Sequence, residues 1–306
     1  MHTSITNVET LFDLGKLTNY LVTKWKWFIA LGFSFAIVFA LISINLPDEY
    51  TSEILLADAD STSGDMGGIA GQLGGLASIA GININSGKNK KLIALQIFES
   101  RKFLVDFVKD NKIEALLFAV ESWDNTEKQF IYDEGKFNVK TKEWLPRPGL
   151  TISYYPTDLE IHLKMKSLLE VDVDKTNKVT RMWLTYYHPQ RAQQWLGMLV
   201  EKLNNSLRQT ELDEKEAQIS FLQQELNLEK NSEIRNVFYS LIEEQLKSST
   251  LAKARNEYIF RIIDPAIYPE NPSAPKKALI TILGGLVGGV FCFVIFTIRF
   301  IFKREV

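Results

Sequence analysis

The chain carries two long runs of apolar residues, one near each end, and neither run contains a charged side chain. The first covers residues 27–46 and the second covers residues 278–298. An α-helix needs about 20 apolar residues to cross the hydrocarbon core of a bilayer, and both runs have that length. Because lipid offers backbone amides no hydrogen-bond partner, a helix is the structure that satisfies them within each run. We therefore expect two transmembrane helices with the rest of the chain between them.

A cleaved signal peptide is the alternative interpretation of the first run. The run is about twice as long as the apolar part of a usual signal peptide. In addition, 26 residues precede it, and no A-x-A-like cleavage site follows Leu46. These features favour a retained membrane anchor.

The lysine and arginine residues close to the spans favour one orientation. Basic residues precede the first span and acidic residues follow it: Lys16, Lys24 and Lys26, then Asp48, Glu49 and Glu53. The second span is followed by Arg299, Lys303 and Arg304, whereas Lys276 and Lys277 on its other side are an exception. We expect residues 1–26 and 299–306 in the cytoplasm and about three quarters of the chain outside it.

Residues 47–188 predict a mixed α/β base next to the first span. Segments rich in aliphatic, aromatic and Thr residues predict strands at residues 50–57, 171–173 and 179–187. Apolar residues at helical spacing predict a pair of helices within residues 90–111, the second capped by Ser100, and a helix at residues 157–169. Residues 124–149 mix charges, aromatics and prolines, which favours short strands and loops.

Residues 61–87 are dense in Gly, Ala and Ser but also carry several Ile and Leu residues. One interpretation is a mobile loop. The other is an apolar segment that packs against a neighbouring subunit or the bilayer surface, because pure linkers lack such residues. The sequence leaves both open.

A long helical hairpin is predicted at residues 189–253. Leucine and isoleucine recur at a spacing of three to four residues over residues 189–229, and Pro189 suits the first position of a helix. At 1.5 Å per residue this helix is about 60 Å long, so part of it must project from a small domain. After Asn231 and Ser232 a second apolar stripe predicts an antiparallel return helix that pairs with the first as in a coiled coil.

Residues 254–277 lead back to the membrane. Within them, residues 258–263 predict a closing strand that could pair with the first strand. Four prolines follow, at Pro265, Pro269, Pro272 and Pro275. Such a stretch favours an extended, semi-rigid stem that delivers the chain to the second span.

The second span contains a small-residue face. Gly284 and Gly288 are four residues apart, as are Gly285 and Gly289, so each pair lies on one side of the helix. Small residues let transmembrane helices approach closely. The partner of this face could be the first span, a neighbouring subunit or another membrane protein.

The composition argues against several classes of function. A net charge of -2, without a basic patch of interleaved aromatics, argues against nucleic-acid binding. Asp58, Asp60 and Asp65 lack the ligand spacing of an EF-hand, and the three histidines are too scattered for a metal site. His188 directly precedes the long helix, which indicates a boundary residue rather than a base. With no G-x-S-x-G elbow either, we expect no enzymatic activity and no cofactor.

The order of these features resembles the polysaccharide co-polymerases, the chain-length determinant family that includes the O-antigen chain-length regulators. The most specific match is IDPAIYPENPSAPKKALITILGGLVGG, residues 263–289, which is similar to the family's proline-rich motif running into a glycine-rich second span. The segment LFDLGKLTNYLVTKWKWFI, residues 11–29, and the strand after the first span also resemble the family pattern.

This resemblance implies a membrane α+β protein of the bacterial inner membrane, with a periplasmic α/β base, a projecting helical hairpin and assembly into ring-like homo-oligomers. It implies a non-catalytic regulator of O-antigen chain length in lipopolysaccharide biosynthesis, with an inner-membrane polymerase, the lipid-linked glycan and membrane lipids as partners. Export relatives continue into a tyrosine kinase with a phosphate-binding loop. No G-x-x-x-x-G-K-[ST] motif occurs here, which favours the kinase-free class.

Two other classes remain as alternatives. The first is a transport component, either a co-polymerase for capsule, enterobacterial common antigen or exopolysaccharide that works with a separate kinase or transporter, or a periplasmic adaptor. Adaptors usually have one span, so the second span argues against that version. The second class is a membrane sensor, for which the short cytoplasmic segments leave little room for an output module.

Overall fold

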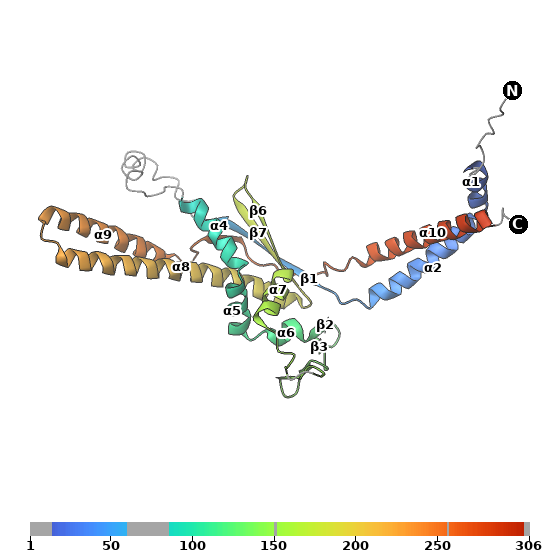
Figure 1. Ribbon diagram of the computed structural model, residues 1–306, viewed down its shortest axis with the longest axis horizontal. Coiled ribbons are helices and arrows are strands. Elements are labelled where there is room, and N and C mark those ends of the chain that lie inside the picture. Colours follow the sequence, from blue (N-terminus) through green and yellow to red (C-terminus); the bar gives the residue numbers. More distant parts are fainter. Residues whose placement is uncertain (1–13, 60–85, 150–151, 256, 303–306) are drawn as a thin grey trace, which may run out of the picture. The chain divides into compact units, whose positions relative to one another are not determined.

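The computed structural model of the chain describes residues 14–59, 86–149, 152–255 and 257–302 (Figure 1). Most of the predicted Gly-rich loop 61–87, residues 1–13 and residues 303–306 lie outside these ranges, as do His2, Asp60 and Asp65. The chain forms two units, one made of Met1–Asp48 and Ser273–Val306 and the other of Glu49–Pro272.

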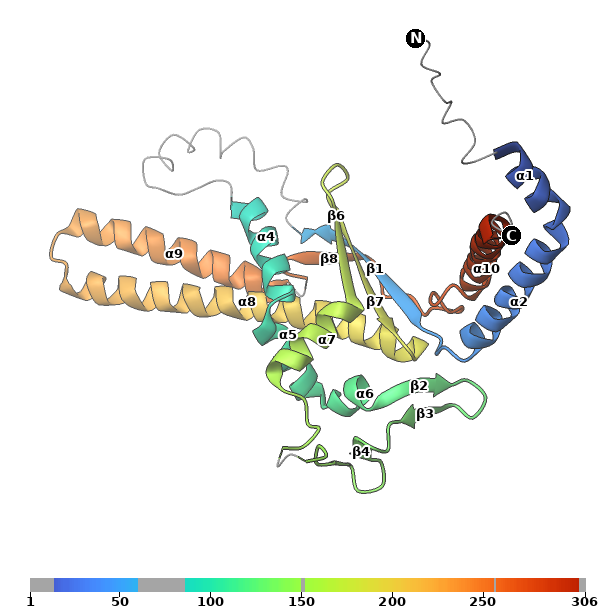
Figure 2. The ribbon, with the colours of Figure 1, turned by 45° about the vertical axis from the view of Figure 1, so that its right-hand side comes forward.

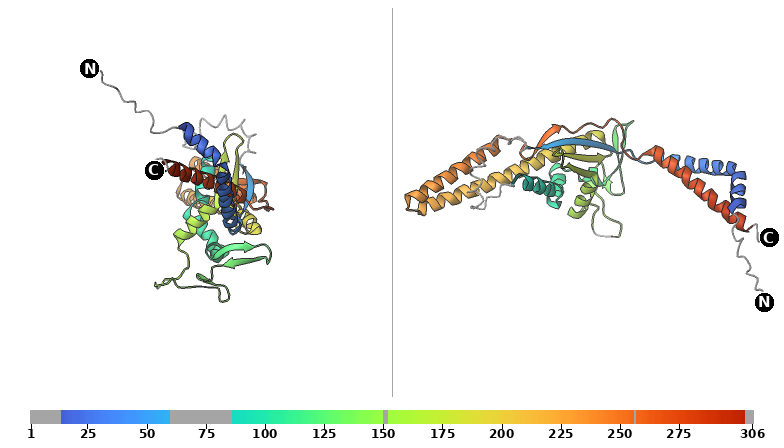
Figure 3. Two further views of the ribbon diagram at one scale, coloured as in Figure 1. Left: turned by 90° about the vertical axis from the view of Figure 1, so that its right-hand side faces the viewer. Right: turned by 90° about the horizontal axis from the view of Figure 1, so that it is seen from above.

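The first unit contains the two apolar helices. These are α2 (Trp25–Ile44) and α10 (Lys277–Phe302), preceded by the short helix α1 (Leu14–Thr23). Both long helices have the length and apolar composition needed to cross a membrane. They pack against each other, next to one another in Figure 1 and inclined to one another in the right view of Figure 3. The predicted pair of apolar helices is therefore present. Helix α2 begins two residues earlier than predicted, and it ends at Ile44, before Leu46, where Pro47 disfavours helix.

The second unit is built on an antiparallel sheet of four strands in the order β6-β7-β1-β8. The strands are β1 (Tyr50–Asp58), β6 (Leu169–Asp174), β7 (Val179–Tyr186) and β8 (Phe260–Asp264). In β7 buried residues alternate with less buried ones, so one face of the sheet carries the core. The predicted closing strand does pair with the first: Leu56 lies opposite Ile262.

Helices cover the core face of this sheet (Figure 2). They are α4 (Ser86–Phe98), α5 (Arg101–Asn111), α7 (Asp158–Leu168) and the first half of α8 (Pro189–Leu228). Ser100 caps α5, as predicted, by accepting a hydrogen bond from the backbone N–H of Phe103 at 3.3 Å. Thr157 and Glu160 form a reciprocal capping box at the start of α7. These signals explain why both helices begin where they do.

The predicted helical hairpin is present. Helix α8 has 40 residues, and α9 (Ser232–Ala254) returns along it (Figure 1). The first part of α8 is anchored in the core by Trp195, Leu196, Leu199 and Leu203, all at most 1% exposed. Beyond Leu207 the burial decreases, because α9 is the main neighbour there. The mixed α/β region with its long helix confirms the predicted fold class.

Between α5 and α7 the chain forms a small region of short elements, of the kind predicted for residues 124–149. It consists of α6 (Glu114–Phe118), β2 (Val120–Asp124), β3 (Gln129–Tyr132), β4 (Phe137–Asn138) and β5 (Glu143–Trp144). Strands β2 and β3 pair with each other, and β4 pairs with β5. The hydroxyl of Tyr186 in β7 donates to the carbonyl oxygen of Leu116 at 2.5 Å, which attaches α6 to the main sheet.

Candidate functional site: paired apolar helices and an aromatic cleft

The contact between α2 and α10 is made by small residues. A Cβ atom added to Gly32 in α2 would lie 3.3 Å from the carbonyl oxygen of Gly285 in α10. One added to Gly285 would lie 3.6 Å from the Cβ of Ala36. Approach this close is what small residues permit between membrane helices.

The predicted glycines of α10 differ in what they face. A Cβ on Gly284 would lie 2.5 Å from Phe39, and one on Gly288 would lie 2.8 Å from the Cβ of Phe35. A Cβ on Gly289 would meet no described atom within 4 Å. Three of the four glycines thus lie against α2, whereas Gly289 leaves open space.

Gly32 and Ala36 were not singled out from the sequence, although a signal existed. They lie four residues apart in the first span and so repeat the small-residue spacing of the second. The alternatives left open for the partner of the glycine face included the first span, and the structure places that span beside it.

Charged residues mark the two ends of this helix pair. At one end Lys277 Nζ lies 2.8 Å from Asp48 Oδ1. At the other end a pocket of about 460 Å³ is lined by apolar, aromatic and basic residues, among them Lys24, Trp27 and Arg299. The ion pair balances the charge of Lys277, one of the two lysines that opposed the predicted orientation.

The four prolines of the stem follow β8 and precede α10. Pro265 comes directly after the last residue of β8, and Pro269, Pro272 and Pro275 lie in irregular chain that ends before Lys277. The glycines of α10 lie further along the chain, after Lys277.

The start of the stem is attached to the sheet by hydrogen bonds. The backbone N–H of Ile267 donates to the carbonyl of Glu53 at 3.0 Å, and Ser52 Oγ donates to the Ile267 carbonyl at 2.7 Å. Gln193 Nε2 in α8 donates to the carbonyl of Ala266 at 2.8 Å. Pro265 has no backbone N–H with which to bond β1. The bonds of Ile267 therefore hold the chain against β1 beyond this proline.

A polar cluster joins α4, α8 and the segment before β8 at the base of the hairpin. Lys90 Nζ of α4 lies 3.1 Å from Glu211 Oε2 of α8 and 3.3 Å from the hydroxyl of Tyr258. Partial burial disfavours the charged carboxylate, yet Lys90 and Lys215 outweigh it and lower the pKa of Glu211. Burial likewise opposes the charge on Lys90, but Tyr258 and Glu211 raise its pKa overall. The cluster is a structural attachment.

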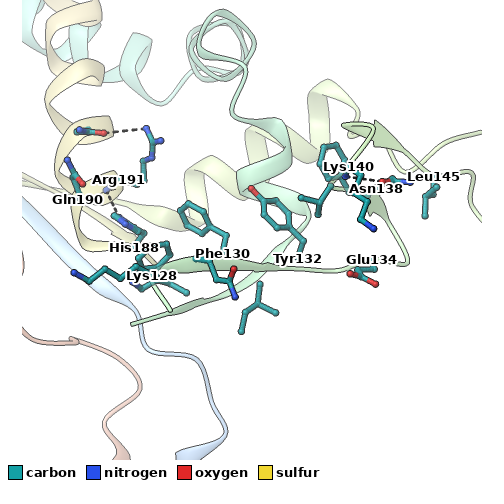
Figure 4. Close-up of a pocket in the computed structure, with 16 residues that line it drawn as sticks. Lys128, Phe130, Tyr132, Glu134, Asn138, Lys140, Leu145, His188, Gln190 and Arg191 are labelled. Carbon is teal, nitrogen blue, oxygen red and sulfur yellow. Dashed lines mark hydrogen bonds between the residues drawn. The ribbon is translucent and has the colours of Figure 1, made fainter. Parts of the chain in front are cut away.

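A concave surface of about 1270 Å³ in the second unit lies between the β2–β3 hairpin and the start of α8. We call it the aromatic cleft. In Figure 4 Phe130 and Tyr132 lie on β3, with His188 beside one end and Lys140 and Asn138 toward the other. Phe130 and Tyr132 share a face of β3 because they are two residues apart.

The rings in and beside the aromatic cleft form a continuous series. Ring centroids lie 4.1 Å apart for His188 and Trp123, 4.9 Å for Trp123 and Phe130, and 6.3 Å for Phe130 and Tyr132. The series continues from Tyr132 to Phe137 at 6.0 Å with the rings nearly parallel. Such contacts make the cleft wall a rigid aromatic surface.

His188 sets the start of α8 and also lines the cleft. Its Nδ1 accepts a hydrogen bond from the backbone N–H of Arg191 at 3.2 Å, so the ring caps the helix as a neutral acceptor. Partial burial, aided by the charge of Arg191, lowers its pKa. The sequence interpretation of His188 as a boundary residue is confirmed.

The candidate chemistry found in the sequence has structural explanations where the residues are described. Asp58 Oδ1 lies 2.7 Å from Lys91 Nζ. Among the described residues, no group of three or more His, Cys, Asp or Glu side chains could hold a metal ion. Sequence reasoning missed the aromatic cleft, because its residues come from short strands with no clear periodicity.

The C-terminal part of the chain matches a known family. Residues 220–301 match the GNVR model, described as a G-rich domain on putative tyrosine kinase. This range covers the end of α8, all of α9, the proline-containing stem and most of α10, and so it includes residues 263–289, the most specific part of the resemblance stated from the sequence. The match confirms that resemblance.

Among solved structures, the chain is similar to one described as a full-length bacterial polysaccharide co-polymerase. The two are 14% identical, the alignment covers 96% of this chain and 99% of that chain, and the TM-score is 0.36. No curated protein matches the chain significantly.

Proposed function

We propose that the chain is a polysaccharide co-polymerase that regulates, without catalysis, the chain length of O-antigen or a related lipid-linked surface polysaccharide. The observation that carries the proposal is the match over residues 220–301, in which the return helix, the stem and the glycine-containing span follow one another. In this proposal the protein is a scaffold on which an inner-membrane polymerase extends the glycan.

A scaffold of this kind requires self-assembly, and the hairpin offers a surface for it. Ile234, Val237 and Leu241 lie at helical spacing on one side of α9 and are 42%, 57% and 38% exposed. Apolar residues that share an exposed helix face commonly mark a protein interface. We infer that this face packs against a second copy of the chain in a homo-oligomer.

The proposed location is the bacterial inner membrane, with both termini in the cytoplasm and the second unit in the periplasm. Lys24, Lys26 and Arg299 at one end of the helix pair support this orientation under the positive-inside rule. At the other end, Asp48 pairs with Lys277. The basic excess thus lies at the end proposed to face the cytoplasm.

Deletion of the gene tests the proposal. We expect extracted lipopolysaccharide to lose its preferred range of O-antigen lengths on a gel, and a plasmid copy of the gene to restore it. The total amount of polymer should change less than its length distribution, because the protein does not catalyse polymerisation. An unchanged ladder, with every other surface glycan intact, would refute the proposal.

The description of the matched family favours a second candidate function. A G-rich domain found on putative tyrosine kinases is consistent with a co-polymerase for capsule or exopolysaccharide export that works with a separate kinase. The same deletion distinguishes the two candidates. A normal O-antigen ladder together with loss of capsule or exopolysaccharide would favour the export function.

A further inference from the structure

The aromatic cleft combines apolar ring surfaces with amide side chains. Its volume of about 1270 Å³ exceeds the roughly 300–1,000 Å³ of a typical small-molecule site. The rings of Trp123, Phe130 and Tyr132 form one wall, and the amides of Asn138 and Gln190 lie on its borders. The cleft therefore has room for a ligand longer than one small molecule.

This combination of groups suits a saccharide. A sugar ring has a C–H face, which packs on the electron-rich face of an aromatic ring, and hydroxyl groups that both donate and accept hydrogen bonds. An amide matches a hydroxyl because it also carries donors and an acceptor. Asn138 Oδ1 already accepts from the backbone of Lys140 and Thr141, which fixes the side chain and leaves its Nδ2 donor without a partner among the described residues.

The charges of the aromatic cleft favour an acidic ligand. Lys128, Lys140 and Arg191 line it, and Glu134 is the one carboxylate among its described lining residues. None of the three cations forms an ion pair with a described residue. The start of α8 adds a partial positive charge beside Arg191. Arg191 does donate a hydrogen bond to Gln194 Oε1 at 3.4 Å, but no described carboxylate pairs with any of the three cations, so a negatively charged group in the cleft would not compete with one.

The geometry points to the aromatic cleft as a binding site for a segment of an acidic glycan, with sugar rings on Trp123, Phe130 and Tyr132 and carboxylates beside Lys128, Lys140 and Arg191. This inference rests on the proposed function in one respect, because it takes the regulated polymer as the ligand. It adds the chemical class of that polymer and the surface that binds it.

Binding by the full chain in nanodiscs tests the inference. The probes are tetragalacturonic acid, which carries one carboxylate per sugar, and maltotetraose, a neutral oligosaccharide of the same length. Saturation-transfer NMR gives the dissociation constants. We expect the acidic probe to bind at least about tenfold more tightly than the neutral one, with the difference shrinking as the salt concentration rises.

Charge variants locate the site. Lys128→Gln together with Lys140→Gln should weaken binding of the acidic probe by about tenfold or more. The matched control is Lys175→Gln together with Lys247→Gln, which removes the same charge from exposed positions outside the cleft and should leave binding unchanged. Equal weakening in both double variants would overturn the inference.

An aromatic variant gives an independent measurement. Phe130→Leu keeps the side chain apolar but removes the ring, so it should weaken binding of both probes while the thermal unfolding midpoint shows that the fold persists. Unchanged binding would overturn the inference, as would failure of the acidic probe to bind the unmodified chain. Cross-linking of Lys128→Cys to a second copy would also overturn it, because a neighbouring subunit would then occupy the cleft.

The outcomes separate this inference from the proposed function. A changed glycan ladder on gene deletion, without binding of tetragalacturonic acid, would refute the glycan-binding site but leave the proposed function intact. Charge-dependent binding with every glycan unchanged on deletion would instead refute the function.

Discussion

The side chain of Asn204 in α8 forms hydrogen bonds with both the backbone N–H and the backbone carbonyl of Phe260 at the start of β8. Its Oδ1 accepts from the backbone N–H of Phe260 at 3.0 Å, and its Nδ2 donates to the carbonyl of Phe260 at 2.9 Å. Oδ1 also accepts from the N–H of Ile259 at 3.0 Å. Asn204 is 4% exposed, so water cannot replace these bonds. The long helix therefore fixes the point where the chain leaves the hairpin and enters the sheet.

Replacing Asn204 should destabilise the second unit. Asn204→Ala leaves buried donors and an acceptor of β8 without partners, which costs about 2–4 kcal/mol in total. Urea unfolding of the full chain in detergent, followed by tryptophan fluorescence, measures the loss. Asn205→Ala is the control, because Asn205 is the exposed neighbour on the same helix. Similar stability of the two variants would contradict the assigned role of Asn204.

The sequence predicted α8 from its apolar stripe but did not indicate this role of Asn204. In the local sequence, a polar residue beside Leu203 only interrupts the apolar stripe. Its hydrogen-bond partners, Ile259 and Phe260, lie more than 50 residues away along the chain. Periodicity reports which side of a helix is buried. It does not report a contact between a side chain and a distant backbone.

The strength of the local signals explains which elements were predicted. The two apolar helices, the hairpin and β1 have long or strongly patterned segments, and Ser100 and Thr157 are caps that can be read locally. Helix α6 has five residues and β4 has two, too few to show a period. The aromatic cleft depends on such short elements meeting the start of α8, so its site could not be predicted.

A disulfide should form between the two apolar helices. A Cβ on Gly285 would lie 3.6 Å from the Cβ of Ala36, within the range of about 3.5–4.5 Å found in disulfides. Ala36→Cys together with Gly285→Cys, with Cys292→Ser to remove the native thiol, should cross-link within one chain under mild oxidation. A shift in mobility on a non-reducing gel detects it. A band at twice the chain mass would instead indicate contact between copies.

Substitution of Gly288 should separate these helices, whereas substitution of Gly289 should not. A Cβ atom at Gly288 would lie 2.8 Å from Phe35 and 3.0 Å from two backbone atoms of α2. Unlike the end of a flexible side chain, the helix backbone cannot shift locally, so the two helices would have to separate. Gly288→Leu should therefore slow formation of the engineered disulfide. Gly289→Leu adds the same side chain where nothing described lies within 4 Å.

The same two variants distinguish packing within a chain from packing between chains. Normal disulfide formation in Gly289→Leu, together with a smaller native mass in nanodiscs, would assign the Gly289 side of α10 to a neighbouring molecule. Equal loss of the disulfide in both variants would show that the assigned helix face is wrong.

His188 should make stability depend on pH in a defined window. Its pKa in the folded protein is lowered by burial and by Arg191, so the unfolded chain binds a proton more readily. The stabilisation is complete above about pH 6.5, the ordinary pKa of His, and decreases as the pH falls toward the lowered folded value. Below that value it should decrease no further.

The variant His188→Asn isolates this contribution. Asparagine also caps helices well, so it should preserve the start of α8 while removing the titrating group. Urea unfolding between pH 5 and pH 7.5 should then show a smaller decrease in stability at low pH than the unmodified chain. Parallel curves for the two proteins would rule out His188 as the source.

The end of the hairpin should be exposed on the periplasmic side of the membrane. Lys230 lies between α8 and α9 and is exposed, whereas Lys26 lies near the start of α2 beside the other basic residues. In a Cys292→Ser background, Lys230→Cys should react with a membrane-impermeant maleimide once the outer membrane alone is permeable. Lys26→Cys should react after the inner membrane is opened, because the basic residues before α2 favour the cytoplasm. The reverse order of labelling would invert the proposed orientation, and with it the side on which the hairpin and the aromatic cleft could meet a growing glycan.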